Sequence, residues 1–93
     1  MTYSTLHVII NDMGDTNQNL PPPLRNRIYY YVLCVSAFAE QKNIPQSDAY
    51  NYLNTFKGID FLIDCYDVEH TLSLDNAVED LTMVCKNNGG TIE

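Results

Sequence analysis

The apolar residues of the chain recur at helical spacing in four segments, which predicts an all-α fold built as a small bundle of four helices. The first helix is expected over residues 24–42. Its apolar stripe consists of Leu24, Ile28, Tyr31, Val35 and Phe38. The middle of this helix, IYYYVLCVSAFA, is apolar on nearly all sides, so we expect other helices to cover it on more than one side.

The remaining helices are expected over residues 46–57, 59–67 and 73–86. Pro45 separates the first helix from the second, and Gly58 is expected to end the second in the left-handed conformation that glycine adopts without strain. Ser73 carries a hydroxyl that can cap the fourth helix. The buried faces predicted for the second and fourth helices consist of Ala49, Tyr50, Leu53, Phe56, Leu74, Val78, Leu81 and Cys85.

Residues 1–23 differ from the helical part and are expected to form an N-terminal extended arm followed by a Pro-rich linker. The alternation of Leu6, Val8 and Ile10 resembles a single β-strand, which needs a partner for its backbone groups. Three alternatives remain open: the arm adds a strand to another protein, lies on its own helices, or is a mobile tail. The helical domain is expected over residues 24–88, with a flexible tail over residues 89–93.

The formal charge of −7 is concentrated in the C-terminal third. Residues 1–57 contain four acidic and four basic residues, whereas residues 58–93 contain eight acidic residues and one base, Lys86. This distribution repels nucleic acid and anionic membranes and attracts basic partners. A helix-turn-helix over residues 46–67 would carry acidic and no basic residues on its recognition helix, so we expect no nucleic-acid binding.

A cytoplasmic location is expected. The first residues lack the basic start of a signal peptide, and the apolar run over residues 28–38 is shorter than the about 20 residues that cross a bilayer. The three cysteines show no paired spacing and are interpreted as reduced core thiols.

No catalytic set is expected, although Cys65, Asp67 and His70 are close in sequence. The chain shows no oxyanion loop, and its histidines and cysteines lack the spacing of metal ligands, so neither a metal nor another cofactor is expected. The alternative, a small hydrolase or transferase built on Cys65 and His70, requires both side chains to share an open pocket. The simpler interpretation is that the side chains of Asp67, His70 and Thr71 satisfy backbone groups in a turn.

Four segments resemble the DUF3791 family of small bacterial proteins: FAEQKNI at residues 38–44, YNYLNTF at 50–56, GIDFLIDCYDVEHT at 58–71 and NAVEDL at 76–81. The resemblance covers about residues 28–84 and rests mainly on Tyr66, Asp67, His70 and Thr71, which with Gly58 form a structural motif. The first 23 residues and the TLSLD segment after His70 depart from the family pattern. Because genes of this family neighbour toxin-like genes, the resemblance implies an antitoxin-like role.

The function expected from these observations is a non-enzymatic interaction module that binds and neutralises a partner protein, such as a cognate toxin, with homodimers as a further possibility. The residues expected to bind the partner are Tyr3, Leu6, Val8, Ile10, Asp60, Asp64, Glu79 and Asp80. The alternative is an acidic phage-type inhibitor that mimics nucleic acid, which requires the acidic residues of the third and fourth helices to form one continuous patch.

Overall fold

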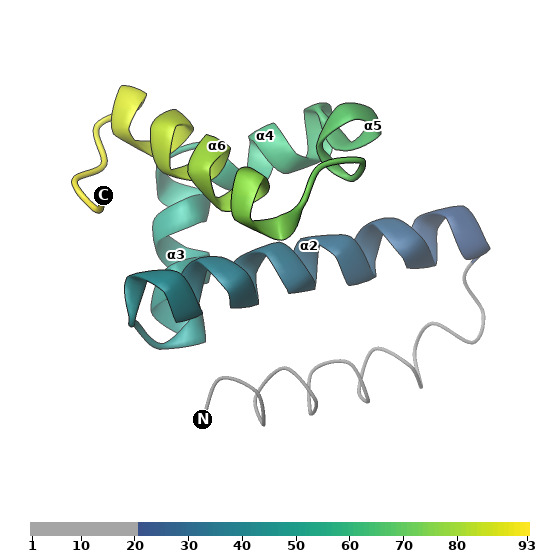
Figure 1. The fold of residues 1–93 in the computed structure, drawn as a ribbon, viewed down its shortest axis with the longest axis horizontal. Helices are drawn as coiled ribbons and strands as arrows, with labels where there is room; N and C mark the ends of the chain where they lie inside the picture. Colours follow the sequence, from purple (N-terminus) through teal and green to yellow (C-terminus); the bar gives the residue numbers. More distant parts are fainter. Residues whose placement is uncertain (1–20) are drawn as a thin grey trace.

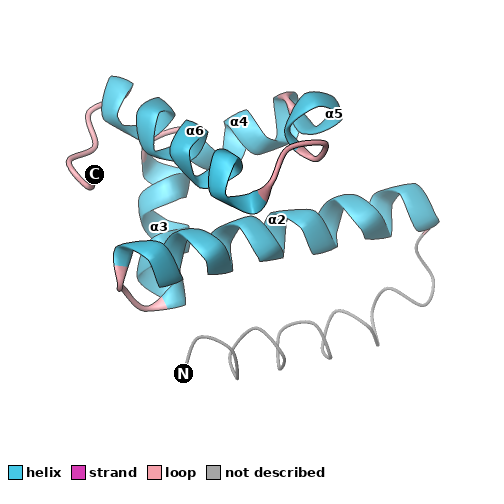
Figure 2. Cartoon of the chain, viewed as in Figure 1, coloured by secondary structure: helices cyan, strands magenta, loops and turns pink. Residues whose placement is uncertain are grey.

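The computed structural model describes residues 21–93, and all regular secondary structure in this range is helical (Figures 1 and 2). The helices are α2 (Pro22–Lys42), α3 (Gln46–Thr55), α4 (Gly58–Asp64), α5 (Tyr66–Glu69) and α6 (Leu74–Asn87). The all-α prediction is thus confirmed for the described residues, with five helices in place of four. The expected strand, with Tyr3, Leu6, Val8 and Ile10, lies outside the described residues.

The corner between α2 and α3 is built from residues with restricted backbone conformations. Asn43 ends α2 in the left-handed conformation, with φ 58°, and the backbone N–H of Ile44 donates to the carbonyl oxygen of Ala39 at 3.0 Å. Pro45 then caps α3 in an extended conformation. Asparagine tolerates a positive φ better than most residues, and proline cannot continue a helix, so this sequence turns the chain sharply.

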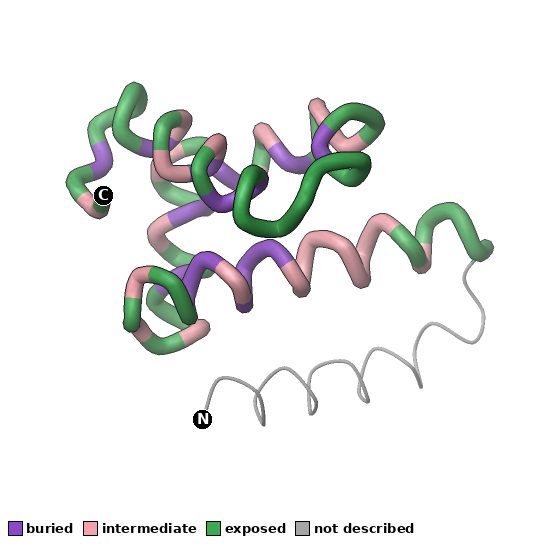
Figure 3. Tube along the Cα trace, in the orientation of Figure 1, coloured by how far each residue is buried: buried purple, intermediate pink, exposed green. Residues whose placement is uncertain are grey.

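The core lies where α2 and α4 each pack against α3 and α6 (Figure 3). Its largest fully buried side chains are Phe38, Leu53, Leu62, Leu81, Val78, Cys34 and Cys85. Burying a leucine or phenylalanine side chain contributes about 1.5–3 kcal/mol, so this cluster supplies much of the driving force for folding. Cys34 and Cys85 are free thiols inside it, whereas Cys65 is half-buried.

Helix α2 is less covered than its composition predicts. Its buried residues, Cys34, Val35, Ser36, Phe38 and Ala39, all lie in the second half of the helix. Residues 24–33 of α2 include no buried residue (Figure 3). Leu24 is 44% exposed. The expectation that the whole apolar middle would be covered on more than one side is therefore wrong for Tyr31 and Val32, which are only half-buried.

The expected third helix, over residues 59–67, is in fact two short helices. Helix α4 begins one residue early, at Gly58, and ends at Asp64, and Cys65, with φ −108° and ψ 19°, separates it from α5. The left-handed residue before α4 is Lys57, with φ 73°, and not Gly58 as expected. Glycine is needed at position 58 for close packing, because an added Cβ would lie 2.8 Å from Leu53 Cδ2 and 3.1 Å from Cys85 Sγ.

Two expected core positions are at the surface. Tyr50 is 47% exposed on α3, and Leu74 is 38% exposed at the start of α6. The first buried residue of α6 is Ala77. The Ser73 cap is confirmed, since its hydroxyl accepts a hydrogen bond from the backbone N–H of Asn76 at 3.1 Å.

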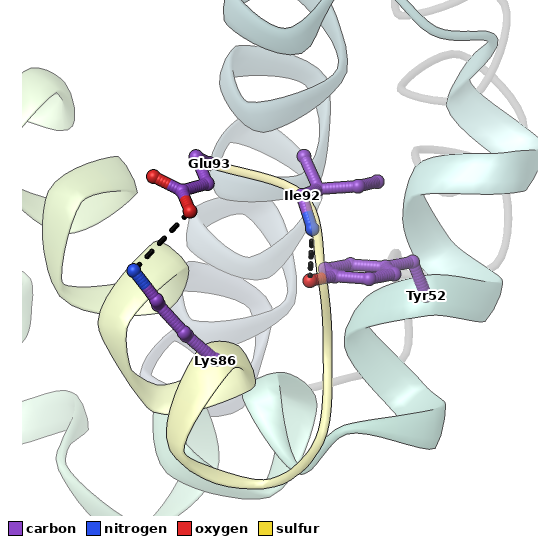
Figure 4. Close-up of polar contacts among 4 residues, drawn as sticks. All are labelled: Tyr52, Lys86, Ile92 and Glu93. Carbon is purple, nitrogen blue, oxygen red and sulfur yellow. Dashed lines mark hydrogen bonds and ion pairs between the residues drawn. The ribbon is translucent and has the colours of Figure 1, made fainter.

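Residues 89–93, expected to be a flexible tail, fold back on the helices in the structure. The backbone N–H of Ile92 donates to the hydroxyl of Tyr52 at 3.0 Å, and Lys86 forms an ion pair with Glu93 at 3.2 Å (Figure 4). Ile92 also packs against the buried core. The C-terminal segment therefore bridges α6 and α3.

Candidate functional site

The turn that ends α5 is held by two side chains that bond to the backbone. His70 Nδ1 donates to the carbonyl oxygen of Tyr66 at 2.7 Å, which requires the proton of a neutral ring to be on Nδ1. The hydroxyl of Thr71 donates to the carbonyl oxygen of Val68 at 2.6 Å. The same two carbonyl oxygens also accept backbone N–H groups, from His70 at 3.0 Å and Thr71 at 3.1 Å, so each side chain adds a second hydrogen bond to its acceptor. Asp67 is not part of this arrangement, because its carboxylate lies 3.6 Å from the guanidinium group of Arg27.

An aromatic cluster joins α5 to the first half of α2. The Tyr66 ring stacks on the His70 ring at a centroid distance of 4.5 Å and an angle of 5°, and the Arg27 guanidinium carbon lies 4.3 Å from the Tyr66 ring centre. The Tyr30 ring meets Tyr66 edge-on at 5.5 Å. Rings and a guanidinium at these distances attract one another through the ring quadrupole. Tyr66 and His70 thus position α5 against α2.

Cys65 and His70 do not form a nucleophile and base pair in this geometry. Within the described residues no hydrogen bond joins them, because His70 is exposed and its Nδ1 is bonded to the Tyr66 carbonyl group. No group of three or more His, Cys, Asp or Glu side chains in residues 21–93 is arranged to hold a metal ion. In the same residues, no helix is long and apolar enough to cross a membrane.

A buried carboxyl group is the feature that sequence reasoning missed. Glu69 on α5 is 4% exposed, and its Oε1 has no hydrogen-bond partner among the described residues. Burial, together with the hydrogen bond and negative charge of Asp80 on α6, raises the pKa of Glu69 to about 7. The two carboxyl groups therefore lie side by side and can share one proton.

The signal for this burial was present in the spacing. Glu69 follows Tyr66 by three positions and Leu62 by seven, so it continues the apolar stripe of the preceding helix. Asp80, predicted as a partner-binding residue, is half-buried beside Glu69.

Tyr30 and Cys34 on α2 complete the polar interior around Glu69. The Tyr30 hydroxyl lies near the Cys34 thiol, and its buried oxygen has no hydrogen-bond partner in the described part of the chain. Burial raises the pKa of Cys34 to about 11 and, with the neighbouring Cys34, raises that of Tyr30 as well. Both groups are therefore protonated at neutral pH, and a protonated thiol is a poor nucleophile.

The exposed acidic residues are spread over several places. Asp60 and Asp64 are exposed on α4, whereas Glu79 on α6 lies in a shallow groove that Lys42 and Lys86 also line. Asp75 accepts a hydrogen bond from the amide of Gln41 at 2.9 Å. This distribution does not favour the nucleic-acid mimic, which requires one continuous acidic patch.

An apolar groove of about 500 Å³ lies between α2, α3 and α4. Helices α2 and α3 each line it with side chains spaced i, i+1 and i+4, and α4 adds Ile59. The lining residues are Tyr31, Val32, Val35, Gln46, Ser47, Tyr50 and Ile59. Its one buried polar atom without a described partner is Gln46 Oε1. The sequence analysis expects three of these side chains, Tyr31, Val35 and Tyr50, on buried helix faces, so it does not predict the groove.

These features define a small all-α domain with a buried polar cluster and an open apolar groove. The chain belongs to the DUF3791 family, described as a protein of unknown function, whose model matches residues 29–88. No curated protein and no solved structure matches the chain.

Proposed function

We propose that the chain is a non-enzymatic subunit that binds and neutralises a partner protein in the manner of an antitoxin. The observation that carries the proposal is the pair of exposed carboxylates, Asp60 and Asp64, on the helix that also lines the apolar groove. An apolar centre with charged residues around it is the usual anatomy of a protein interface.

The charge of these carboxylates supports a basic partner. Neither Asp60 nor Asp64 lies within ion-pair distance of a base in the described residues, whereas Asp67 and Glu93 are paired with Arg27 and Lys86. Unpaired surface charge of one sign accelerates the approach of an oppositely charged protein and disfavours wrong partners.

The chemistry of the interior supports a non-enzymatic role. Burial raises the pKa of both Cys34 and Cys85, so neither is a thiolate at neutral pH, and the His70 ring is bonded to its own helix. The groove is lined by uncharged side chains, none of which is a strong acid, base or activated nucleophile.

The proposal is tested with the product of the gene adjacent to that of this chain. Expression of that product alone is expected to slow growth of a heterologous host, and co-expression of the full chain is expected to restore growth and to yield a complex on co-purification. Leu53→Asp is the negative control, because a charge in the core unfolds the chain. A neighbouring product that is harmless and does not bind would refute the antitoxin-like role.

A further inference from the structure

We propose that the groove between α2, α3 and α4 binds an amphipathic helix of a partner protein, with the apolar face of that helix in the groove and basic residues beside Asp60 and Asp64. The inference rests on the proposed function for the existence of a partner, and it adds the surface and the chemistry of the bound segment.

The length of the apolar surface fits a helix. Val32 and Val35 line the groove, and Leu24 and Ile28 lie on the same face of α2 closer to its start, because residues three or four apart share one helix face. Leu24 and Val35 are eleven positions apart, and this strip is therefore about 16 Å long, which is three turns of a partner helix. Three turns present about three apolar anchors at i, i+4 and i+7 spacing, the usual pattern of helix-in-groove recognition.

The exposure of large apolar side chains on the three helices around the groove supports the same conclusion. Leu24 and Tyr50 are 44% and 47% exposed, and Ile63, one turn beyond Ile59 on α4, is 48% exposed. Large apolar side chains that are contiguous with a groove, and not scattered singly, are typical of interaction sites.

The rim of the groove selects the charge of the partner. Successive helix residues are rotated by about 100°, so Asp60 and Asp64 project beside the stripe that Ile59 and Ile63 form on α4. The groove itself is lined by no charged side chain. A bound segment with lysine or arginine at its edge is attracted by Asp60 and Asp64 without burying a charge in the groove, whereas these carboxylates repel an acidic segment.

Gln46 adds a requirement for one polar contact. Its Oε1 is buried at the groove without a partner among the described residues, and a buried acceptor without a hydrogen bond costs about 1–3 kcal/mol. Because this atom is closed to solvent in the free chain, the Gln46 side chain must rotate before a neutral donor of the bound segment, such as a serine hydroxyl, can reach it and remove that cost.

The test uses the full chain and a synthetic helical peptide of about 18 residues with leucines on one face and lysines on the other. Binding is measured by fluorescence anisotropy. Two matched peptides separate the contribution of charge from that of the apolar face: one has glutamate in place of lysine, and the other has alanine in place of leucine. The lysine–leucine peptide is expected to bind with a micromolar Kd, and each matched peptide about tenfold more weakly or worse.

Two variants of α3 locate the binding site. Ser47→Phe fills the groove from an exposed position and is expected to weaken binding by about tenfold or more. Thr55→Phe makes the same kind of change at an exposed position of α3 outside the groove and is expected to leave binding unchanged. Thermal unfolding followed by circular dichroism verifies that both variants are folded.

Several results would overturn the inference: no saturable binding up to about 1 mM peptide, equal binding of a matched peptide, or equal binding by Ser47→Phe. A dimer of the free chain that Ser47→Phe dissociates would assign the groove to a second copy. If the double variant Leu6→Asp/Ile10→Asp bound the peptide more tightly than the unmodified chain, the groove would be assigned to the N-terminal arm of the chain.

The two proposals fail separately. If the adjacent gene product does not bind but the peptide occupies the groove, the antitoxin-like role fails and the groove assignment stands. If that product binds Ser47→Phe as tightly as the unmodified chain, the groove assignment fails and the role stands.

Discussion

The carboxyl group of Glu69 on α5 lies beside that of Asp80 on α6, in an interior that disfavours two negative charges. The pKa of Glu69 in the folded chain, about 7, is above the ordinary value of 4.5. Between these two values the folded state binds more protons than the unfolded state. The free energy of unfolding therefore falls as pH rises from about 4.5 to about 7. Above that window, the stabilisation that protonated Glu69 gives the folded state is lost.

The corresponding prediction is that Glu69→Gln removes this pH dependence. Since one pKa unit corresponds to about 1.4 kcal/mol, the variant should be more stable than the unmodified chain by on the order of 1–3 kcal/mol at about pH 8. Urea unfolding across the window measures the difference. Asp75→Asn, at an exposed acid of α6, is the control and should retain the slope. An unchanged slope in Glu69→Gln would assign the pH dependence to other groups.

The Lys57–Gly58 pair should respond in opposite directions to substitution. Gly58→Ala is expected to destabilise the chain by about 1–3 kcal/mol, because the added methyl group overlaps Leu53 and Cys85. Lys57→Gly is expected to stabilise it by up to about 1 kcal/mol, because glycine adopts a positive φ without steric cost. Denaturant midpoints give both values. If Gly58→Ala were neutral, the contact between α3, α4 and α6 would be looser than the structure indicates.

The aromatic cluster should control how firmly α5 is docked. Tyr66→Ala removes the ring that contacts both Arg27 and His70, and we expect a loss of about 3 kcal/mol or less, given that Tyr66 is only half-buried. Arg27→Ala should cost about 0.5–1 kcal/mol, since its ion pair with Asp67 is exposed. Amide hydrogen exchange of residues 66–70 measures local opening directly. Asn26→Ala, at an exposed neighbouring position of α2, should leave that exchange unchanged.

The hydroxyl of Tyr52 should contribute through its bond to Ile92. Tyr52→Phe leaves the backbone N–H of Ile92 without this acceptor and is expected to cost about 0.5–1.5 kcal/mol. Tyr50→Phe, two residues earlier and exposed, is the matched control and should be neutral. Thermal unfolding compares the two variants. Equal melting temperatures would show that this hydrogen bond adds nothing to stability.

The helices with strong terminal signals were predictable from the sequence. Pro45, Ser73 and the helical spacing of apolar residues placed α2, α3 and α6 within two residues of their ends. These signals are local, because proline and capping hydroxyls act on the backbone next to them.

The remaining features depend on tertiary contacts that spacing alone does not reveal. The sequence pattern continues as a helix through Cys65, although the structure breaks the helix there. Glycine is needed at position 58 because Leu53 and Cys85, which are distant in sequence, pack against it. Likewise, Tyr31 and Tyr50 have apolar spacing, yet both line the groove, where Tyr31 is only half-buried and Tyr50 is exposed. A periodic pattern predicts which residues share a face but not whether that face meets a neighbour.

The sharp corner from Asn43 to Pro45 has a consequence for the order of folding. Only three residues join α2 to α3, so the entropy lost when these two helices pack together is small. The contact of Arg27 with Tyr66, by comparison, closes a loop of nearly forty residues and costs more entropy. We therefore expect the α2–α3 hairpin to be formed in the transition state and α5 to dock after it. High φ-values at Ala49 and Leu53 and low values at Tyr66 would be the kinetic signature of that order.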